Sequence, residues 1–179
     1  MTCVTLPVSG AVTRDEVTGE EAFDGLIAPL IGAGYRLAYG MLQDSHAAED
    51  VVQEAALRAW RHLHTLRPEA DPAPWFLTIV ANRCRSLSRT RWWSVVRTSE
   101  PPQDAPAAAE PLAGTDLRAA LGRLNAHRRL VVVLHYYLDL PLEAVAEVTG
   151  APLGTVKSRL HRALRDLRVD GGLAEEAPA

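Results

Sequence analysis

The sequence predicts an all-helical protein built from two small domains. Aromatic residues make up only 6% of the chain, whereas Ala, Leu, Val and Arg recur at spacings of three and four, as in amphipathic helices. Residues 98–114 are rich in Pro and Ala, a composition that disfavours regular structure and indicates a flexible linker. We therefore expect helical domains over residues 20–97 and 115–169, with disordered ends over 1–19 and 170–179.

Three helices are expected in the first domain. The first carries an apolar stripe from Phe23 to Met41, and the second starts with Ser45 as its cap and runs to about Leu66. Prolines between residues 68 and 74 then break the chain before the third helix. The buried stripe of that third helix is expected to consist of Phe76, Val80, Cys84 and Leu87.

The second domain is expected to hold four helices. They should lie near residues 117–124, 130–138, 141–148 and 152–169. Val131 to Val133 are β-branched and would suit a strand, but this domain offers no partner strand, so a helix is favoured. Gly150 ends the third of these helices, and the fourth is rich in Lys and Arg. Two helices joined by such a short turn have the form of a DNA-binding helix-turn-helix.

Charge and composition exclude several classes of protein. A formal net charge of -3 argues against a protein that coats nucleic acid through bulk electrostatics. The apolar runs are too short to span a membrane and the N-terminus lacks a signal pattern, so we expect a cytoplasmic location without membrane insertion. Cys3 and Cys84 are expected to be free thiols. Because no phosphate loop, metal-spaced His and Cys set or nucleophile elbow is evident, we expect neither enzymatic activity nor a cofactor or metal.

The final helix can be divided into two faces. Val156, Leu160 and Ala163 can pack inwards, which leaves a polar and basic face outside. That face consists of Lys157, Ser158, His161, Arg162 and Arg165. Arg side chains can read guanine, while Lys and Ser can hold phosphates. The other interpretation, less favoured after such a turn, is an amphipathic helix with a solvated basic face.

Longer strings give a specific family resemblance. Residues 154–167, Gly-Thr-Val-Lys-Ser-Arg-Leu followed by Arg-Ala and Leu, resemble the second region-four helix of extracytoplasmic-function (ECF) sigma factors. Residues 48–54, 57–60 and 74–82 resemble sigma region two, in the order that the family has. Together the matches extend over about residues 22–167. The chain thus resembles an ECF RNA polymerase sigma factor, which directs polymerase to promoters and helps to open them, often in a stress response.

The resemblance implies partners and a role for three sets of residues. Its partners would be core RNA polymerase, promoter DNA and an anti-sigma factor. The polymerase-binding set, spaced along one helix face, is Asp50, Gln53, Glu54 and Leu57. The set for the minus-ten element is Thr78, Asn82, Arg85 and Arg89. The set for the minus-thirty-five element is Lys157, Ser158, Arg159, His161 and Arg162.

Some positions depart from the family or stay open. Ser86 stands where the family usually has Asp, and Pro141 stands near a usual Ser or Thr cap, although proline can still begin a helix. The segment 67–73 matches the loop that captures a flipped-out base. Trp75 could stack on a base, but a core position is favoured.

Two further expectations concern the whole chain. The main alternative function is a helix-turn-helix regulator that binds DNA unaided, which would not explain the region-two strings. Because the linker is long and Pro-rich, we expect the two domains to be poorly fixed relative to each other, so that an anti-sigma factor could insert between them.

Overall fold

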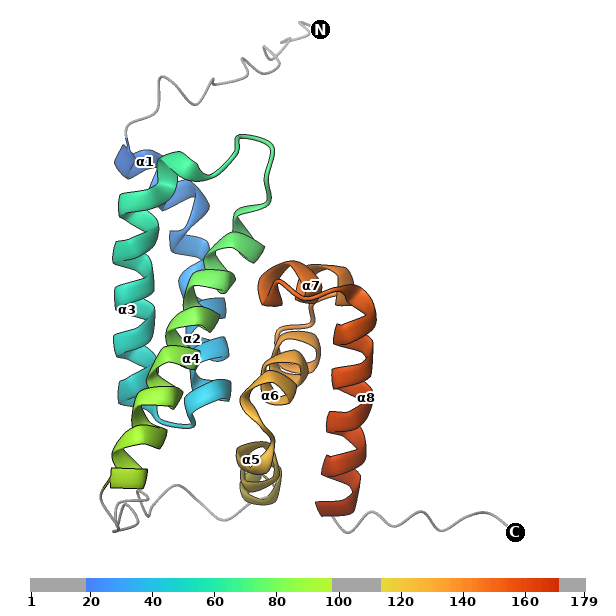
Figure 1. Cartoon of the computed structure of the whole chain (residues 1–179). Helices are drawn as coiled ribbons and strands as arrows, with labels where there is room; N and C mark the ends of the chain where they lie inside the picture. Colours follow the sequence, from blue (N-terminus) through green and yellow to red (C-terminus); the bar gives the residue numbers. More distant parts are fainter. Residues whose placement is uncertain (1–18, 98–113, 171–179) are drawn as a thin grey trace, which may run out of the picture.

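The computed structural model describes residues 19–97 and 114–170, and every regular element in those ranges is a helix. Figure 1 shows two groups of helices side by side, α1 to α4 in one and α5 to α8 in the other. The predicted all-helical, two-domain architecture is therefore confirmed. The expected linker and both expected disordered ends lie outside the described residues, apart from a residue at some borders.

The first apolar stripe forms two helices instead of one. Helix α1 (Gly19–Leu26) is followed by the 3-10 turn η2 (Ala28–Leu30) and then by α2 (Ile31–Leu42). Pro29 lies in η2, and proline in a helix interior removes an N–H donor and clashes with the preceding turn. The expectation of one continuous helix was wrong. It arose because the apolar residues keep their helical spacing on both sides of the break, which hides the effect of Pro29.

Helix α3 (Ser45–His62) continues into the 3-10 turn η3 (Leu63–Thr65). The sequence predicted Ser45 as the N-cap of this helix, but the cap is Asp44. The Asp44 carboxylate accepts a hydrogen bond from the Ala47 amide at 3.0 Å. The inner face of α3 consists largely of small residues, which allow α2 to approach closely. The buried residues on this face are Ala48, Val51, Val52, Ala55 and Ala59.

Helix α4 (Pro72–Arg97) completes the core of the first domain. It begins at Pro72, where the missing N–H costs nothing because a first-turn amide has no helical partner. Phe76 is fully buried and packs against Gly34 of α2; a Cβ there would lie 2.9 Å from the Phe76 ring. Val80 and Cys84 are also buried, as predicted, and Leu87 packs against the core with partial exposure.

The second domain follows the predicted order of helices. These are α5 (Gly114–Arg123), α6 (Ala126–Val132), the π-helical turn η4 (Val133–Tyr137), α7 (Leu142–Thr149) and α8 (Leu153–Asp170). The three consecutive valines are helical and buried, as expected. Pro141 precedes the first residue of α7 and supplies no side-chain cap, while Gly150 ends α7 with a φ of 63°, which suits glycine. Helices α7 and α8 thus form the predicted helix-turn-helix.

The two domains pack against each other. Helices α2 and α4 contact α6, η4 and α7, and buried residues of both domains belong to one apolar core. At one contact, a Cβ on Gly40 would lie only 2.8 Å from Cγ1 of Val133. The structure thus shows the two domains in contact, whereas the expectation that they are poorly fixed relative to each other stays a prediction. The sequence pattern assigned each apolar stripe to its own domain, whereas some of that surface is buried between the domains.

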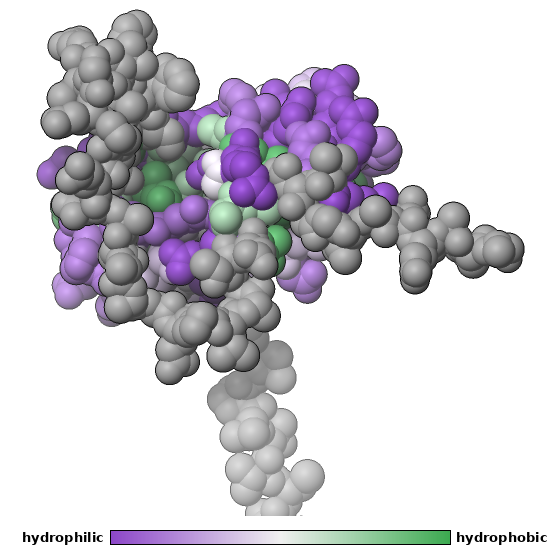
Figure 2. All heavy atoms as spheres, turned by 90° about the horizontal axis from the view of Figure 1, so that it is seen from below, coloured by the Kyte–Doolittle hydropathy of each residue, from purple (hydrophilic) through white to green (hydrophobic). Residues whose placement is uncertain are grey.

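The described surface seen from below is mostly polar. Figure 2, which views the molecule from below, shows hydrophilic side chains over most of the coloured surface and a small apolar region between them. None of the described helices combines the length and the apolar character needed to span a membrane.

Candidate functional site

Helix α3 carries the expected polymerase-binding set on its outer face. Asp50, Gln53 and Glu54 are exposed, and Leu57 exposes 58% of its surface. An exposed leucine flanked by carboxylates and an amide offers an apolar centre with a polar rim, which is the usual anatomy of a protein interface. The structure therefore places these four side chains together, as their spacing predicted.

Arg83 of α4 adds a charged group to this face. Its Nη2 atom lies 2.6 Å from Oε2 of Glu54, and both side chains are about half exposed. The two residues border a shallow pocket of about 190 Å³ between α3 and α4. The pocket is lined by Leu42, Ala47, Asp50, Val51, Glu54, Arg83 and Leu87. Sequence reasoning missed Arg83 as a part of this face, because its partner Glu54 comes from another helix.

Trp60 extends the apolar part of the same face. It is 46% exposed, and its ring meets that of Phe23 edge-on with the ring centres 5.4 Å apart. Since Trp60 follows Leu57 by three residues, the same helical spacing that selected Leu57 could have selected it. Leu57 and Trp60 together give α3 an exposed apolar stripe beside its carboxylates.

The expected minus-ten set is divided by the domain interface. Asn82 is exposed, and its side-chain oxygen accepts a hydrogen bond from the guanidinium of half-buried Arg85. Thr78 instead faces the second domain: its hydroxyl donates to the Pro74 carbonyl at 2.7 Å and lies 3.3 Å from the Val148 carbonyl of α7. The backbone of Arg89 belongs to α4, but its side chain lies outside the described part of the structure.

The expected minus-thirty-five set lies on α8, mostly on one exposed face. Lys157, Ser158, His161 and Arg162 are exposed, and the Ser158 hydroxyl donates to the Thr155 carbonyl at 3.0 Å. Arg159 differs from the others because it is half-buried. The inward residues are buried as predicted: Val156, Leu160 and Ala163.

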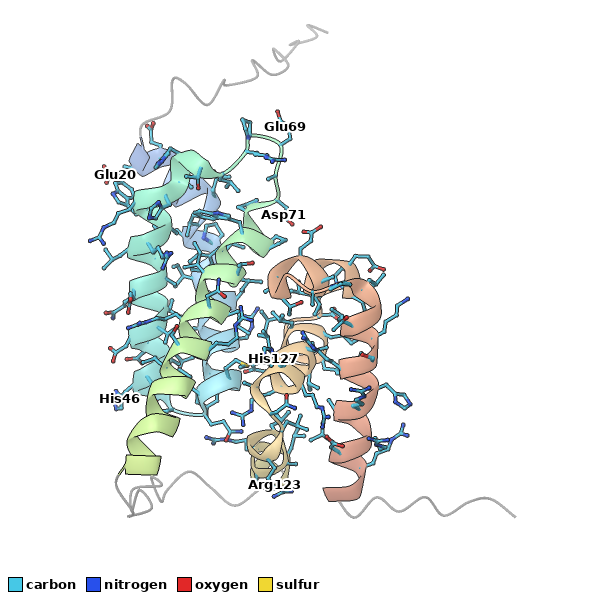
Figure 3. The ribbon with its side chains drawn as sticks, viewed as in Figure 1. Glu20, His46, Glu69, Asp71, Arg123 and His127 are labelled. Carbon is cyan, nitrogen blue, oxygen red and sulfur yellow. The ribbon has the colours of Figure 1, made fainter. Side chains whose placement is uncertain are left out.

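His127 of α6 connects the two basic sets. His127 is largely exposed, but partial desolvation lowers the pKa of its imidazole, and the positive charges of Arg159 and Arg85 lower it further. Figure 3 shows His127 where α6 faces α4, in the seam between the domains. The closed packing therefore brings Arg85 of the first domain and Arg159 of the second into the electrostatic field of one histidine. Sequence reasoning could not find this proximity.

Other candidate groups have structural roles. Trp75 is half-buried and packs against the core, which agrees with the favoured interpretation. Cys84 is buried, and burial raises the pKa of its thiol to about 12, so it is unreactive at neutral pH. Cys3 lies outside the described residues. Among the residues that the structure describes, no three His, Cys, Asp or Glu side chains are grouped so that they could hold a metal ion.

Comparisons with known proteins agree with this arrangement. Residues 26–94 match the family model of sigma-70 region 2, and residues 115–167 match that of sigma-70 region 4. The chain is 36% identical over 172 residues to the ECF RNA polymerase sigma factor SigL of Mycobacterium tuberculosis, covering 90% of this chain and 93% of SigL. It is 32% identical to the RNA polymerase sigma factor SigV of Bacillus subtilis, covering 75% of this chain and 82% of SigV.

Solved structures show the same fold. The sigma factor RpoE of Bartonella quintana, solved with the anti-sigma factor NepR, aligns with a TM-score of 0.70 at 25% identity, covering 86% of this chain and 98% of RpoE. CnrH, solved with the cytosolic domain of CnrY, aligns with a TM-score of 0.66 at 23% identity, covering 87% and 91% of the two chains. With both sigma-70 regions matched in order and close relatives over most of its length, the chain belongs to the ECF RNA polymerase sigma factors.

Proposed function

We propose that this ECF sigma factor binds core RNA polymerase mainly through α3, recognises the minus-thirty-five element through α8 and opens the minus-ten element with α4. The observation that carries the proposal is the presence, in one chain, of an exposed acidic and apolar stripe and a basic helix-turn-helix. A stand-alone helix-turn-helix regulator is not favoured, because it would have no use for a region-two domain.

The polymerase-binding step uses complementary charge around an apolar centre. Asp50 is exposed at the rim of the α3–α4 pocket, and Leu57 offers apolar surface one to two turns further along the helix. Glu54 is already paired with Arg83 inside the chain. A basic group on polymerase therefore meets one carboxylate directly and competes with Arg83 for the other. Asp50 should accordingly contribute more to affinity than Glu54.

The promoter-binding steps use the two basic helices differently. Lys157 and Arg162, in the first three turns of α8, are exposed where a recognition helix enters the major groove. On α4, Asn82 and Arg85 offer an amide and a guanidinium to an unpaired strand, the first for contacts to a base and the second for phosphates. Duplex recognition and strand opening are thus assigned to separate helices.

An anti-sigma factor is proposed as the regulatory partner, with the complex acting in the cytoplasm where polymerase transcribes. RpoE and CnrH were solved as complexes, with the anti-sigma factor NepR and with the cytosolic domain of CnrY respectively. Since α4 already contacts α7 here, an inhibitor need not hold two loose domains together. It has only to favour the arrangement that the chain already adopts.

The test is the affinity of the purified chain for core polymerase. The double variant Asp50→Arg with Glu54→Arg places two positive charges where a basic partner is expected, and should lower the affinity roughly ten- to a hundredfold. The matched control is Glu143→Arg with Glu147→Arg, which reverses two exposed charges at the same spacing on α7. Wild-type affinity of a folded α3 variant would show that the polymerase-binding face lies elsewhere.

A further inference from the structure

The polymerase-binding face of α3 already holds an arginine that belongs to the chain itself. Arg83 reaches across from α4, and its Nη2 atom lies 2.6 Å from Oε2 of Glu54. Asp50, about one turn earlier on α3, is exposed and takes part in no ion pair among the described residues. One of the two carboxylates is therefore occupied in the free chain, whereas the other is open to a partner.

The pocket between α3 and α4 has the composition of a site for a long cationic side chain. Asp50, Glu54 and Arg83 supply the charged part of its lining. The apolar part consists of Leu42, Ala47, Val51 and Leu87. Arginine and lysine lay their methylene stems along apolar surface while the charged head stays near water or a counter-charge. An apolar lining beside two carboxylates therefore suits either side chain, and Arg83 occupies part of this site in the free chain.

Arg83 fits this site incompletely. Its Nε atom is buried and has no hydrogen-bond partner among the described residues, although Nη2 pairs with Glu54. A guanidinium and a carboxylate pair most strongly through two parallel hydrogen bonds, and a buried donor without an acceptor opposes the pairing. Both side chains of the pair are also about half exposed, so water screens their attraction. Another cation can therefore displace Arg83 from Glu54.

We propose that Arg83 holds the place of a polymerase side chain: an arginine or lysine of core polymerase displaces it and binds between Glu54 and Asp50, with its stem over the pocket. Arg83 is then a positioning residue that limits the affinity for polymerase, because its pair with Glu54 must break before the new pair forms. This inference rests on the proposed function, in which α3 binds polymerase. It adds a competitor within the chain and the class of side chain that replaces it.

The test is the equilibrium affinity of the full-length chain for core polymerase, measured by titrating fluorescently labelled chain with polymerase. Arg83→Met removes the charge but keeps an unbranched side chain, and should raise the affinity about two- to fivefold, as expected for the loss of one exposed ion pair. Arg83→Lys keeps a positive charge and should bind like the wild type. The matched control is Arg36→Met, which removes an exposed arginine on α2 and changes the net charge equally, and should also bind like the wild type.

A second background tests whether the gain in affinity depends on Glu54. In Glu54→Gln the carboxylate that Arg83 holds is absent, so adding Arg83→Met should leave the affinity of that variant unchanged. The same gain in both backgrounds would show that Arg83 acts through another group and would overturn the inference. Equal or weaker binding by folded Arg83→Met would also overturn it, as would a gain with Arg83→Lys or Arg36→Met as large as that with Arg83→Met.

Thermal unfolding separates this role from a structural one. Arg83→Met should leave the midpoint unchanged or slightly lower while the affinity for polymerase rises, whereas a residue that only supports the fold would lower both, which would contradict the inference. If Arg83→Met does not fold, Arg83→Gln replaces it in the same measurements. Unchanged affinity of Asp50→Arg with Glu54→Arg would count against the proposed function itself. Loss of affinity in that variant, without a gain in the Arg83 variant, would overturn only the present inference.

Discussion

Replacing Arg129 by leucine should destabilise the protein more than replacing an exposed arginine by leucine. The side chain donates to three carbonyl groups, that of Met41 across the domain interface and those of Gly122 and Leu124 in its own domain, and a hydrogen bond from a charged donor contributes about 1.5–3 kcal/mol. These contributions are not additive, and desolvation, which lowers the pKa of the Arg129 guanidinium, offsets part of them. We therefore expect Arg129→Leu to reduce the free energy of unfolding by about 2–4 kcal/mol.

The assay is urea unfolding followed by circular dichroism at neutral pH. With a denaturant dependence of about 1–3 kcal/mol per molar urea, the midpoint should fall by roughly 1–2 M. Arg36→Leu, at an exposed position on α2, is the control and should change stability by less than about 0.5 kcal/mol. Combining Arg129→Leu with Gly40→Ala should give less than the sum of the single effects, because both weaken one interface. A change no larger than that of the control would refute the role assigned to Arg129.

Three other predictions address the DNA-binding surfaces. Arg162→Ala should weaken closed-complex formation by about 1–3 kcal/mol if the side chain reads a base, and footprinting on duplex promoter DNA measures this loss. Asn82→Ala should spare duplex binding but reduce permanganate reactivity of the opened strand; equal activity on intact and pre-melted promoters would remove its melting role. Arg85→Gln should raise the pKa of His127 toward its ordinary value of 6.5, measured by NMR titration, while partial desolvation and Arg159 keep it below that value.

The sign of the His127 effect also determines how stability depends on pH. The pKa of His127 is lower in the folded chain than in the unfolded chain. The stability that neutral His127 contributes to the fold is therefore fully present above about pH 6.5 and is lost as the pH falls through the folded pKa. The positive neighbours are Arg85 on α4 and Arg159 on α8. Removing Arg85 should therefore make the loss of stability in mild acid smaller. An unchanged titration midpoint would contradict the domain packing described here.

Local patterns predicted most of the helices and their exposed faces. The spacing of Asp50, Gln53, Glu54 and Leu57 placed them on one side of α3, and Gly150 marked the turn of the helix-turn-helix. Such features depend on residues a few positions apart, which a single sequence displays. The helix break at Pro29 was not predicted. The regular apolar spacing indicated one helix, although a proline at this position is a local signal for a break.

The relation between the two domains could not be predicted in the same way. Arg129 reaches Met41 across 88 positions, and Thr78 meets Val148 across 70. Neither pair leaves a periodic signal, since each side chain also fits its own helix. Arg83 was missed for the same reason, because its partner Glu54 lies on another helix. The composition of residues 98–114 predicted a linker between the domains. It gave no information about whether the surfaces of the two domains fit each other.

The most direct test of the account is reconstituted transcription. Core RNA polymerase, with and without the purified chain, would transcribe fragmented DNA from the source organism, and the 5′ ends of all transcripts would be sequenced. The account predicts that the chain adds a limited set of start sites, each preceded by shared minus-ten and minus-thirty-five sequences, and that Asp50→Arg with Glu54→Arg abolishes them. The same start sites with and without the chain would contradict it.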